Sequence, residues 1–141
     1  MEPIKILIAD DHSLFRGIVR DFLSSIATVS VVGEAVDGLD VVQKVEDLDP
    51  DVILMDIKMP NRDGLEATRL IKQRWPSKIV VITTMHEDDA YRIRARELGA
   101  DGFILKSAMK PRLQEAFREG SSIADWVHSS GDGDRSAARK L

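Results

Sequence analysis

Five short apolar runs alternate with longer segments of helical periodicity, and this alternation limits the fold more than any other feature of the chain. The runs occupy residues 4–10, 28–34, 51–56, 78–84 and 102–106. Four of them are continuously apolar, as in parallel strands covered by helices on both faces, whereas the second alternates as an edge strand does. The pattern predicts an α/β protein with an open, doubly wound parallel sheet and right-handed crossovers.

The segments between and after the runs predict five helices. Residues 14–26 repeat apolar side chains at steps of three and four, with Ser13 as the expected N-cap. Residues 40–48 predict a second helix, and Asp63 with Glu66 form a capping box for a third. Helices thus follow strands in strict alternation, as a doubly wound sheet requires.

The last two predicted helices are less regular. Residues 88–98 have a thin apolar side and three arginines, which we interpret as a solvated face. A helix with so few apolar anchors is a candidate for movement. The fifth helix begins near Pro111, and its apolar stripe continues through Gly120 to Val127. An internal glycine costs about 1 kcal/mol, so one long helix and two separate pieces are both open alternatives.

Composition indicates one domain and agrees with a reducing compartment. The 141 residues predict a domain over residues 1–128 and a flexible tail over 129–141. The chain has no cysteine, no apolar run long enough to cross a bilayer and no recognisable secretion signal, so we expect a cytoplasmic protein without membrane contact. The net charge of -4 argues weakly against a general nucleic-acid surface.

Acidic side chains mark the ends of two predicted strands. Asp10 and Asp11 end the first run, and Asp56 ends the third. Because the carboxyl ends of parallel strands share one rim, these carboxylates should converge and repel one another unless a cation lies among them. With no thiol available, a hard, oxygen-binding ion is expected, and Mg²⁺ suits a site with few protein ligands.

The same rim should receive a hydroxyl and an ammonium group. Thr84 ends the fourth run, and Lys106 ends the fifth. A carboxylate beside Mg²⁺, opposed by these two groups, suits phosphoryl transfer, in which positioning and charge neutralisation supply most of the catalysis. Asp56 would be the nucleophile, while Lys106 and Thr84 would contact phosphoryl oxygens. We therefore expect a phosphoacceptor rather than an enzyme acting on a separate substrate.

Four motifs in this order and spacing, "ADDH", "LMDIKMPNRDG", "ITTMH" and "GADGFILKS", resemble the receiver domain of two-component response regulators, over about residues 4–118. The similarity is greatest to receivers with a helix-turn-helix output. The resemblance implies a flavodoxin-like sheet of order 2-1-3-4-5 and phosphorylation of Asp56 by a histidine kinase or phosphotransfer protein. It also implies Mg²⁺ held by Asp11, Asp56 and the backbone carbonyl of Lys58, with Asp10 acting through water.

The resemblance also points to a switch pair, Thr84 and Phe103, and the chain departs from the family pattern at two positions. Phe103 lacks the hydroxyl of the tyrosine often found there, so a switch that depends on that hydroxyl cannot operate. Ser107 replaces the frequent proline after the lysine, so the usual cis peptide is not implied. Lys58 and His86 should project over the mouth of the pocket, and we expect them to set the lifetime of the phosphoryl group.

Other site assignments fit less well. His12 beside the two carboxylates is interpreted as a surface or capping residue rather than a metal ligand. A phosphohydrolase with an aspartate nucleophile would carry a second acid where Lys58 stands. A flavin or nucleotide binder would need a phosphate loop after the first strand, where this chain has two anions.

The output of the switch has two interpretations. After the receiver the chain offers no further segment of helix-turn-helix length, which favours a stand-alone receiver acting through protein contacts, without direct nucleic-acid binding. The alternative is the N-terminal receiver of a two-domain DNA-binding transcriptional regulator, with the last residues as an interdomain linker. A phosphorylation-dependent homodimer is compatible with either.

Overall fold

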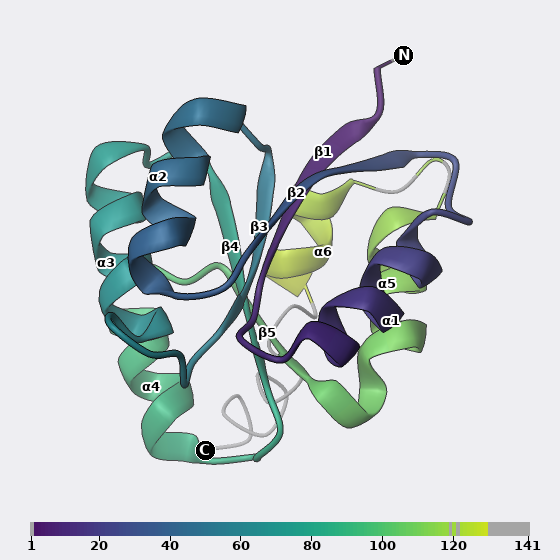
Figure 1. Ribbon diagram of the computed structural model, residues 1–141. Helices are drawn as coiled ribbons and strands as arrows, with labels where there is room; N and C mark the ends of the chain where they lie inside the picture. The colour runs from purple at the N-terminus through teal and green to yellow at the C-terminus, as the bar shows by residue number, and fades with distance from the viewer. Residues whose placement is uncertain (1, 119, 121, 130–141) are drawn as a thin grey trace.

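A single parallel sheet organises the molecule, with strand order β2-β1-β3-β4-β5 (Figure 1). The computed structural model describes residues 2–118, 120 and 122–129. The strands are β1 (Ile4–Ala9), β2 (Val29–Ala35), β3 (Val52–Asp56), β4 (Ile79–Thr84) and β5 (Gly102–Leu105). This confirms the predicted flavodoxin-like order and the edge position of β2. Each of the five predicted apolar runs therefore corresponds to one strand of the sheet.

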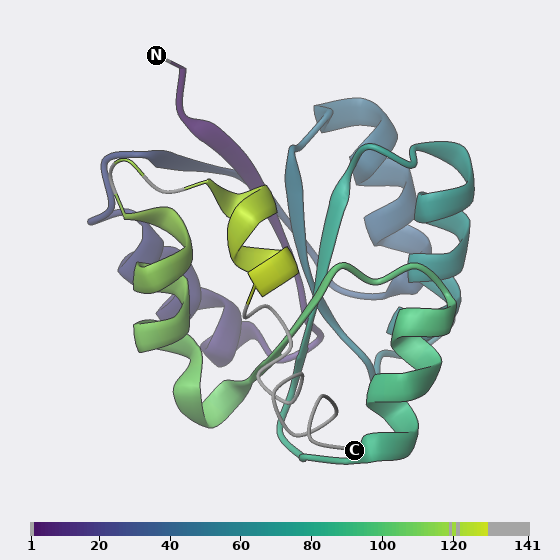
Figure 2. The same cartoon turned by 180° about the vertical axis from the view of Figure 1, so that it is seen from behind.

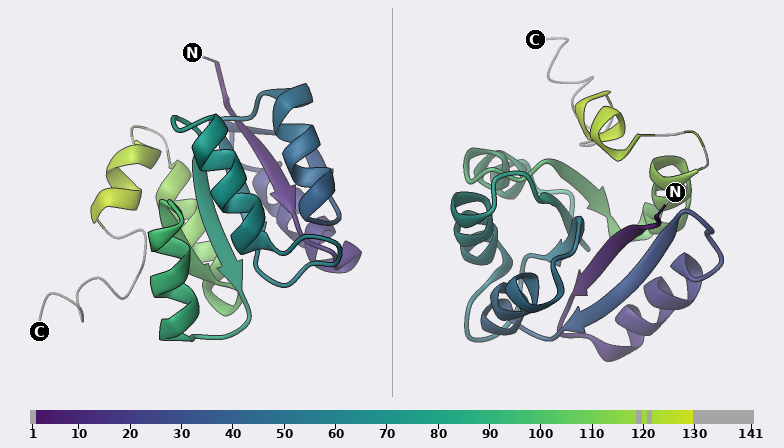
Figure 3. Two further views of the ribbon diagram at one scale, coloured as in Figure 1. Left: turned by 90° about the vertical axis from the view of Figure 1, so that its left-hand side faces the viewer. Right: turned by 90° about the horizontal axis from the view of Figure 1, so that it is seen from above.

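Helices cover both faces of the sheet, as the continuous apolar strands require. The helices are α1 (Ser13–Leu23), α2 (Gly38–Leu48), α3 (Gly64–Arg74), α4 (Asp89–Glu97), α5 (Met109–Phe117) and α6 (Ile123–Ser129), with a short 3₁₀ turn, η1 (Lys106–Ala108). α1, α5 and α6 lie on one face and α2, α3 and α4 on the other (Figure 3). Each face encloses its own apolar cluster.

Side-chain hydrogen bonds at the N-termini of α1 and α3 fix the turns that lead from the strands into these helices. Asp63 caps α3 as predicted, because its carboxylate accepts the Glu66 N–H at 2.9 Å. The expected N-cap of α1 was wrong by one residue. His12 is the N-cap and α1 begins at Ser13. The physical reason is that Asp10 accepts the His12 N–H at 2.9 Å, which fixes the turn without a Ser13 side-chain cap.

The C-terminal apolar stripe forms two helices. α5 ends at Phe117 and α6 begins at Ile123, with Gly120 between them at a φ of 82°. The chain leaves the helix at Arg118, whose backbone is extended, and turns at Gly120 in a left-handed conformation that glycine adopts easily, so the single long helix is not found. α6 then lies beside α5 on the same face (Figure 2), where Trp126 and Val127 join the apolar cluster.

The remaining expectations concern the chain end and membranes. Ser129 is the last residue of α6, and the rest of the predicted tail, 130–141, lies outside the described residues. Among the helices of the described part of the chain, none combines the length and apolarity needed to cross a bilayer.

Candidate functional site

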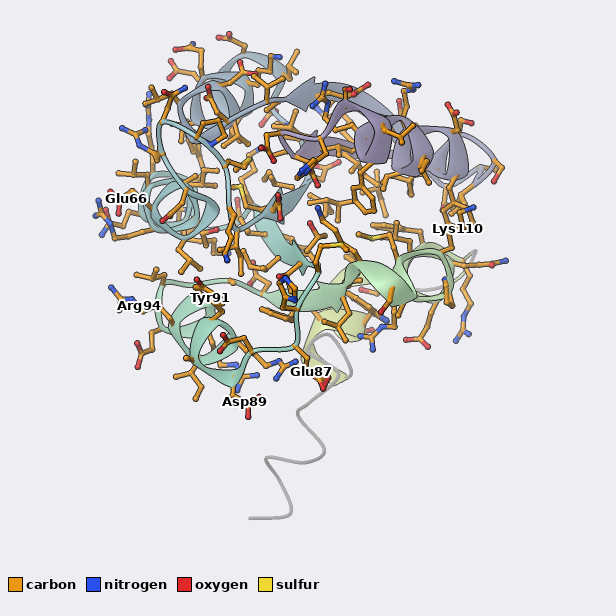
Figure 4. The ribbon with its side chains drawn as sticks, turned by 60° about the horizontal axis from the view of Figure 1, so that its bottom comes forward. Glu66, Glu87, Asp89, Tyr91, Arg94 and Lys110 are labelled. Atoms are coloured by element: carbon orange, nitrogen blue, oxygen red, sulfur yellow. The ribbon has the colours of Figure 1, made fainter. Side chains whose placement is uncertain are left out.

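The predicted site residues meet at the carboxyl-terminal rim of the sheet, which faces the reader in Figure 4. Asp10 follows β1, Asp56 ends β3, Thr84 ends β4, and Lys106 follows β5. Asp10 is 1% exposed and Asp56 is 6% exposed. Two carboxylates removed from water at one place carry a large desolvation cost, which a positive partner must offset.

Lys106 is that partner. Its Nζ donates to Asp10 Oδ2 at 2.5 Å and lies 3.6 Å from Asp56 Oδ1, and its side chain is 5% exposed. The ammonium group also lies 4.3 Å from the centroid of the Phe15 ring, which adds a favourable cation–π contact. The lysine thus reaches across the rim from the start of η1 to β1 and β3.

Asp56 is strongly perturbed by this environment. Burial, and then the nearby charge of Asp10, raise the pKa of its carboxyl to about 6, although Lys106 acts in the opposite direction. One carboxylate oxygen accepts the Ile57 N–H at 3.0 Å. A carboxylate kept at such a cost is typical of a functional position.

Four side chains offer ligand atoms for a cation. Atoms of Asp10, Asp11, His12 and Asp56 all lie within 4.8 Å of one another. Asp11 and His12 are exposed, so the cluster opens to solvent on their side. The His12 Nδ1 lies 3.3 Å from Asp10 Oδ1 and 3.3 Å from Asp11 Oδ1, so the ring rests against both carboxylates. The three carboxylates come together as the sequence predicted.

The glycine that begins α3 after Asp56 has a steric explanation. A Cβ at Gly64 would lie 1.9 Å from the carbonyl oxygen of Asp56, and the Gly64 N–H donates to the Ile57 carbonyl at 2.6 Å. Only a glycine permits this approach of α3 to the end of β3. The turn therefore locks the backbone that carries Asp56.

The two positions expected to set the phosphoryl lifetime lie on loops at the same rim. Lys58 is exposed, and its Nζ lies 5.8 Å from the ring centroid of Tyr91 on α4. His86 is exposed too, and its backbone N–H donates to the Thr84 hydroxyl at 3.3 Å. Thr84 is buried at 7% exposure, with its hydroxyl oxygen engaged at the end of β4.

The expected switch pair occupies two neighbouring strands. Thr84 pairs with Leu105, and Phe103 pairs with Ile82, so both lie on the β4–β5 border of the sheet. Phe103 is 4% exposed, and the guanidinium of Arg92 lies 4.7 Å from its ring centroid. Arg92 is itself buried, which corrects the expectation that all the arginines of this helix form a solvated face; Arg94 and Arg96 are exposed.

The family model described as the response regulator receiver domain matches residues 6–118. The chain belongs to this family. The receiver is 39% identical over 125 residues to the transcriptional regulatory protein DegU of Brevibacillus brevis, covering 89% of this chain and 53% of the relative. It is 40% identical over 116 residues to the response regulator GacA of Pseudomonas aeruginosa, covering 82% and 54%.

Solved structures agree with the assignment. The signal receiver domain of the response regulator NarL from Mycobacterium tuberculosis has a TM-score of 0.80 at 30% identity, covering 92% of this chain and 99% of that chain. The receiver spans about half the length of the curated relatives that it matches. Its fold and its acidic rim are thus those of a receiver domain.

Sequence reasoning missed two contacts of the site. Phe15 was assigned only to the apolar stripe of α1, and nothing in the sequence indicates that its ring would meet Lys106. Arg16 was not singled out, yet its guanidinium donates to the Asp10 carbonyl at 2.7 Å. Its position one turn after the acidic pair, on a helix that starts at the rim, is the only signal that could have found it.

Proposed function

We propose that this receiver accepts a phosphoryl group on Asp56 from a histidine kinase or histidine phosphotransfer protein, in a Mg²⁺-dependent step. The observation that carries the proposal is the position of Lys106, whose ammonium group is buried between Asp10 and Asp56. An ammonium held beside a buried carboxylate can neutralise an anionic group added to that carboxylate.

The donor set fits a divalent cation. Three carboxylates within 4.8 Å of one another and one ammonium leave a formal charge of about -2 at the rim, which a divalent ion neutralises. All the acidic donors are oxygens, the ligand type that Mg²⁺ prefers. Asp11, Asp56 and the backbone carbonyl of Lys58 would hold the ion, with Asp10 contributing through water. When bound, Mg²⁺ would neutralise phosphoryl oxygens and offset the repulsion among the carboxylates.

Asp56, Lys106 and Thr84 each have a separate role in the proposed phosphoryl transfer. An Asp56 carboxylate oxygen forms the new bond to phosphorus as the bond from phosphorus to the imidazole nitrogen of the donor breaks, and the leaving imidazole takes a proton from water. Lys106 turns from the carboxylates to a phosphoryl oxygen. The Thr84 hydroxyl donates to another, which pulls on the β4–α4 loop. In this scheme the receiver is a phosphoacceptor that assists its own modification, and not an enzyme with a separate substrate.

Labelling with a small donor tests the acceptor. Asp56→Asn should lose Mg²⁺-dependent incorporation of radioactive phosphoryl groups from acetyl phosphate, while Asp47→Asn, which alters an exposed carboxylate on α2, should keep it. Incorporation in Asp56→Asn at the rate and stoichiometry of the parent would show that the acceptor is another residue.

We further propose that the output is DNA binding through a helix-turn-helix domain. The expectation of a stand-alone receiver without nucleic-acid contact is not confirmed, and the alternative of a receiver from a two-domain regulator fits better. Its support is that DegU is named a transcriptional regulatory protein and that the receiver spans 53% of its length. Expression of the natural reading frame tests this. A mobility shift on promoter DNA that increases with acetyl phosphate is expected, and a reading frame that ends with this chain would contradict it.

A further inference from the structure

Arg16 connects three parts of the molecule at the acidic rim. Its Nη1 donates to the carbonyl oxygen of Asp10 at 2.7 Å, and its Nε donates to Glu34 Oε1 at 3.0 Å. The side chain is 14% exposed, so these bonds lie largely out of water. One guanidinium from α1 therefore joins the end of β1 to the edge strand β2.

The Asp10 carbonyl belongs to the peptide that links Asp10 to Asp11. The other side of Asp10 is already fixed, because its N–H donates to the Ala35 carbonyl at 3.0 Å. A hydrogen bond to the carbonyl, beside the bond from the His12 N–H to the Asp10 carboxylate, restricts the rotation of the Asp10–Asp11 peptide plane. That plane decides the direction in which Asp11 leaves the strand.

Glu34 holds the guanidinium in place. Arg20, one turn further along α1, donates from Nη1 to Glu34 Oε2 at 2.9 Å, so the carboxylate binds both arginines. Burial raises the pKa of Glu34, but hydrogen bonds from Arg20 and Arg16 outweigh it and the pKa is lowered. Glu34 therefore stays ionised and offsets the positive charge of Arg16 beside a cation site.

We propose that Arg16 is a positioning residue for the divalent cation: by holding the Asp10 carbonyl it directs the carboxylates of Asp10 and Asp11 into the pocket. This inference depends on the proposed metal site. The alternative is that Arg16 only ties α1 to β2. The two roles predict opposite changes in cation affinity when Arg16 is replaced by a neutral residue. Removal of a positive charge near a cation site tightens binding if nothing else changes, whereas loss of positioning weakens it.

The chain contains a matched control. Arg16→Gln and Arg20→Gln remove the same charge from the same helix and each removes one bond to Glu34, but only Arg16 contacts Asp10. Mn²⁺ alone is the probe, and the loss of its free-ion paramagnetic resonance signal measures binding without phosphorylation. Arg16→Gln should raise the dissociation constant about tenfold, as typical of residues that orient metal ligands. Arg20→Gln should leave it within about twofold of the parent.

Two further measurements separate positioning from folding. Arg16→Lys retains the charge but has a single donor group for two acceptors, so its affinity should lie between those of the parent and Arg16→Gln. Metal-free amide exchange at residues 11–13 should become faster in Arg16→Gln and not in Arg20→Gln, while denaturant unfolding reports any shared loss of stability.

The outcomes are distinct. Equal or tighter Mn²⁺ binding in Arg16→Gln, or equal weakening in both glutamine variants, would overturn the inference. Failure of the parent to bind Mn²⁺ would overturn the proposed metal site instead, and the exchange comparison at residues 11–13 would then decide whether Arg16 orders the acidic segment. If Arg16→Gln does not fold, Arg16→Lys against Arg20→Lys gives the same comparison.

Discussion

Asp56 is destabilising in its ionised form when no cation is bound. Its folded pKa of about 6 lies above the ordinary value of 3.8. Between these pH values the native state binds more protons than the unfolded state, so the free energy of unfolding falls as pH rises from about 4 to about 6. The contribution is fully present below the unfolded pKa and is lost above the folded pKa, and it amounts to about 3 kcal/mol at most.

Asp56→Asn should therefore stabilise the metal-free protein at pH 8 by about 1–3 kcal/mol, with a gain that disappears towards pH 4. Urea unfolding at several pH values, with Asp47→Asn as control, measures this. Added Mg²⁺ should stabilise the parent more than Asp56→Asn. A gain that is the same at pH 4 and pH 8 would show that the carboxylate is not perturbed by its surroundings.

Lys58 and His86 should prolong the life of the phosphoryl group. Hydrolysis needs a water in line with the bond from phosphorus to Asp56, and both side chains leave loops at the mouth of the site. The Lys58 Nζ lies 5.8 Å from the centroid of the Tyr91 ring on α4. Small or acidic side chains at these positions would admit or orient the water.

Loss of the label in excess Mg²⁺ should thus be faster in Lys58→Asn, in His86→Glu and most of all in the double variant, by about tenfold or more if general-base assistance is gained. Lys110→Asn, which changes an exposed lysine on α5, is the control. Rates equal to the parent in all three variants would remove both residues from this role.

The sequence predicted the charged residues of the site better than it predicted the side chains that pack against functional residues. Asp10, Asp56 and Lys106 could be found because strand ends in a parallel sheet share a rim. Arg92 could not, because its position among charged neighbours on α4 predicts exposure, and only the fold places it on Phe103. Contacts of this kind depend on distances between elements that local patterns do not contain.

Among the elements, we expect phosphorylation to shift the face made by α4, β5 and α5, with α4 as the part that moves. It follows the loop that carries Thr84, and Arg92 connects it to β5. Charge-assisted bonds from Thr84 and Lys106 would supply about 3–6 kcal/mol. Inversion of a 1:99 equilibrium needs about 5.5 kcal/mol, so the energy is of the right order.

Beryllofluoride, a mimic of the phosphoryl group, should alter amide exchange over residues 88–98 and at Phe103, and leave α2 unchanged. The comparison is made with Mg²⁺ present and with binding of the mimic verified independently. Identical exchange in α4 with the mimic bound would rule out this helix as the moving part.

The boundary between α5 and α6 could not be predicted from the sequence pattern. The break after α5 was an open alternative because an apolar stripe continues through Gly120, and periodicity alone does not tell a helix from two helices on the same face. The backbone leaves the helix at Arg118, which is extended, and the positive φ of Gly120 separates the two helices.

For the molecule as a whole, α6 completes the apolar cluster on the face of α1 and α5. Trp126 is 5% exposed, its Nε1 donates to Glu115 Oε1 at 2.6 Å, and the Arg112 guanidinium lies 4.9 Å from its ring centroid. Trp126→Ala should lower the free energy of unfolding by about 3 kcal/mol, the cost of removing a buried aromatic side chain. Urea unfolding followed by circular dichroism measures this. Trp75→Ala, at a half-buried position, should cost less, and the reverse order would show that α6 contributes little to the core.

The two outer strands of the sheet differ from the inner ones in a way that bears on aggregation. β5 has four residues, and β2 carries a bulge: Ile6 pairs with Val31 and Leu7 with Gly33, which leaves Val32 without a counterpart on β1. An edge strand offers unpaired backbone groups that a second chain can extend, but regular pairing does not propagate along a short or bulged edge. Both edges therefore resist the strand-by-strand growth through which exposed sheets form fibrils.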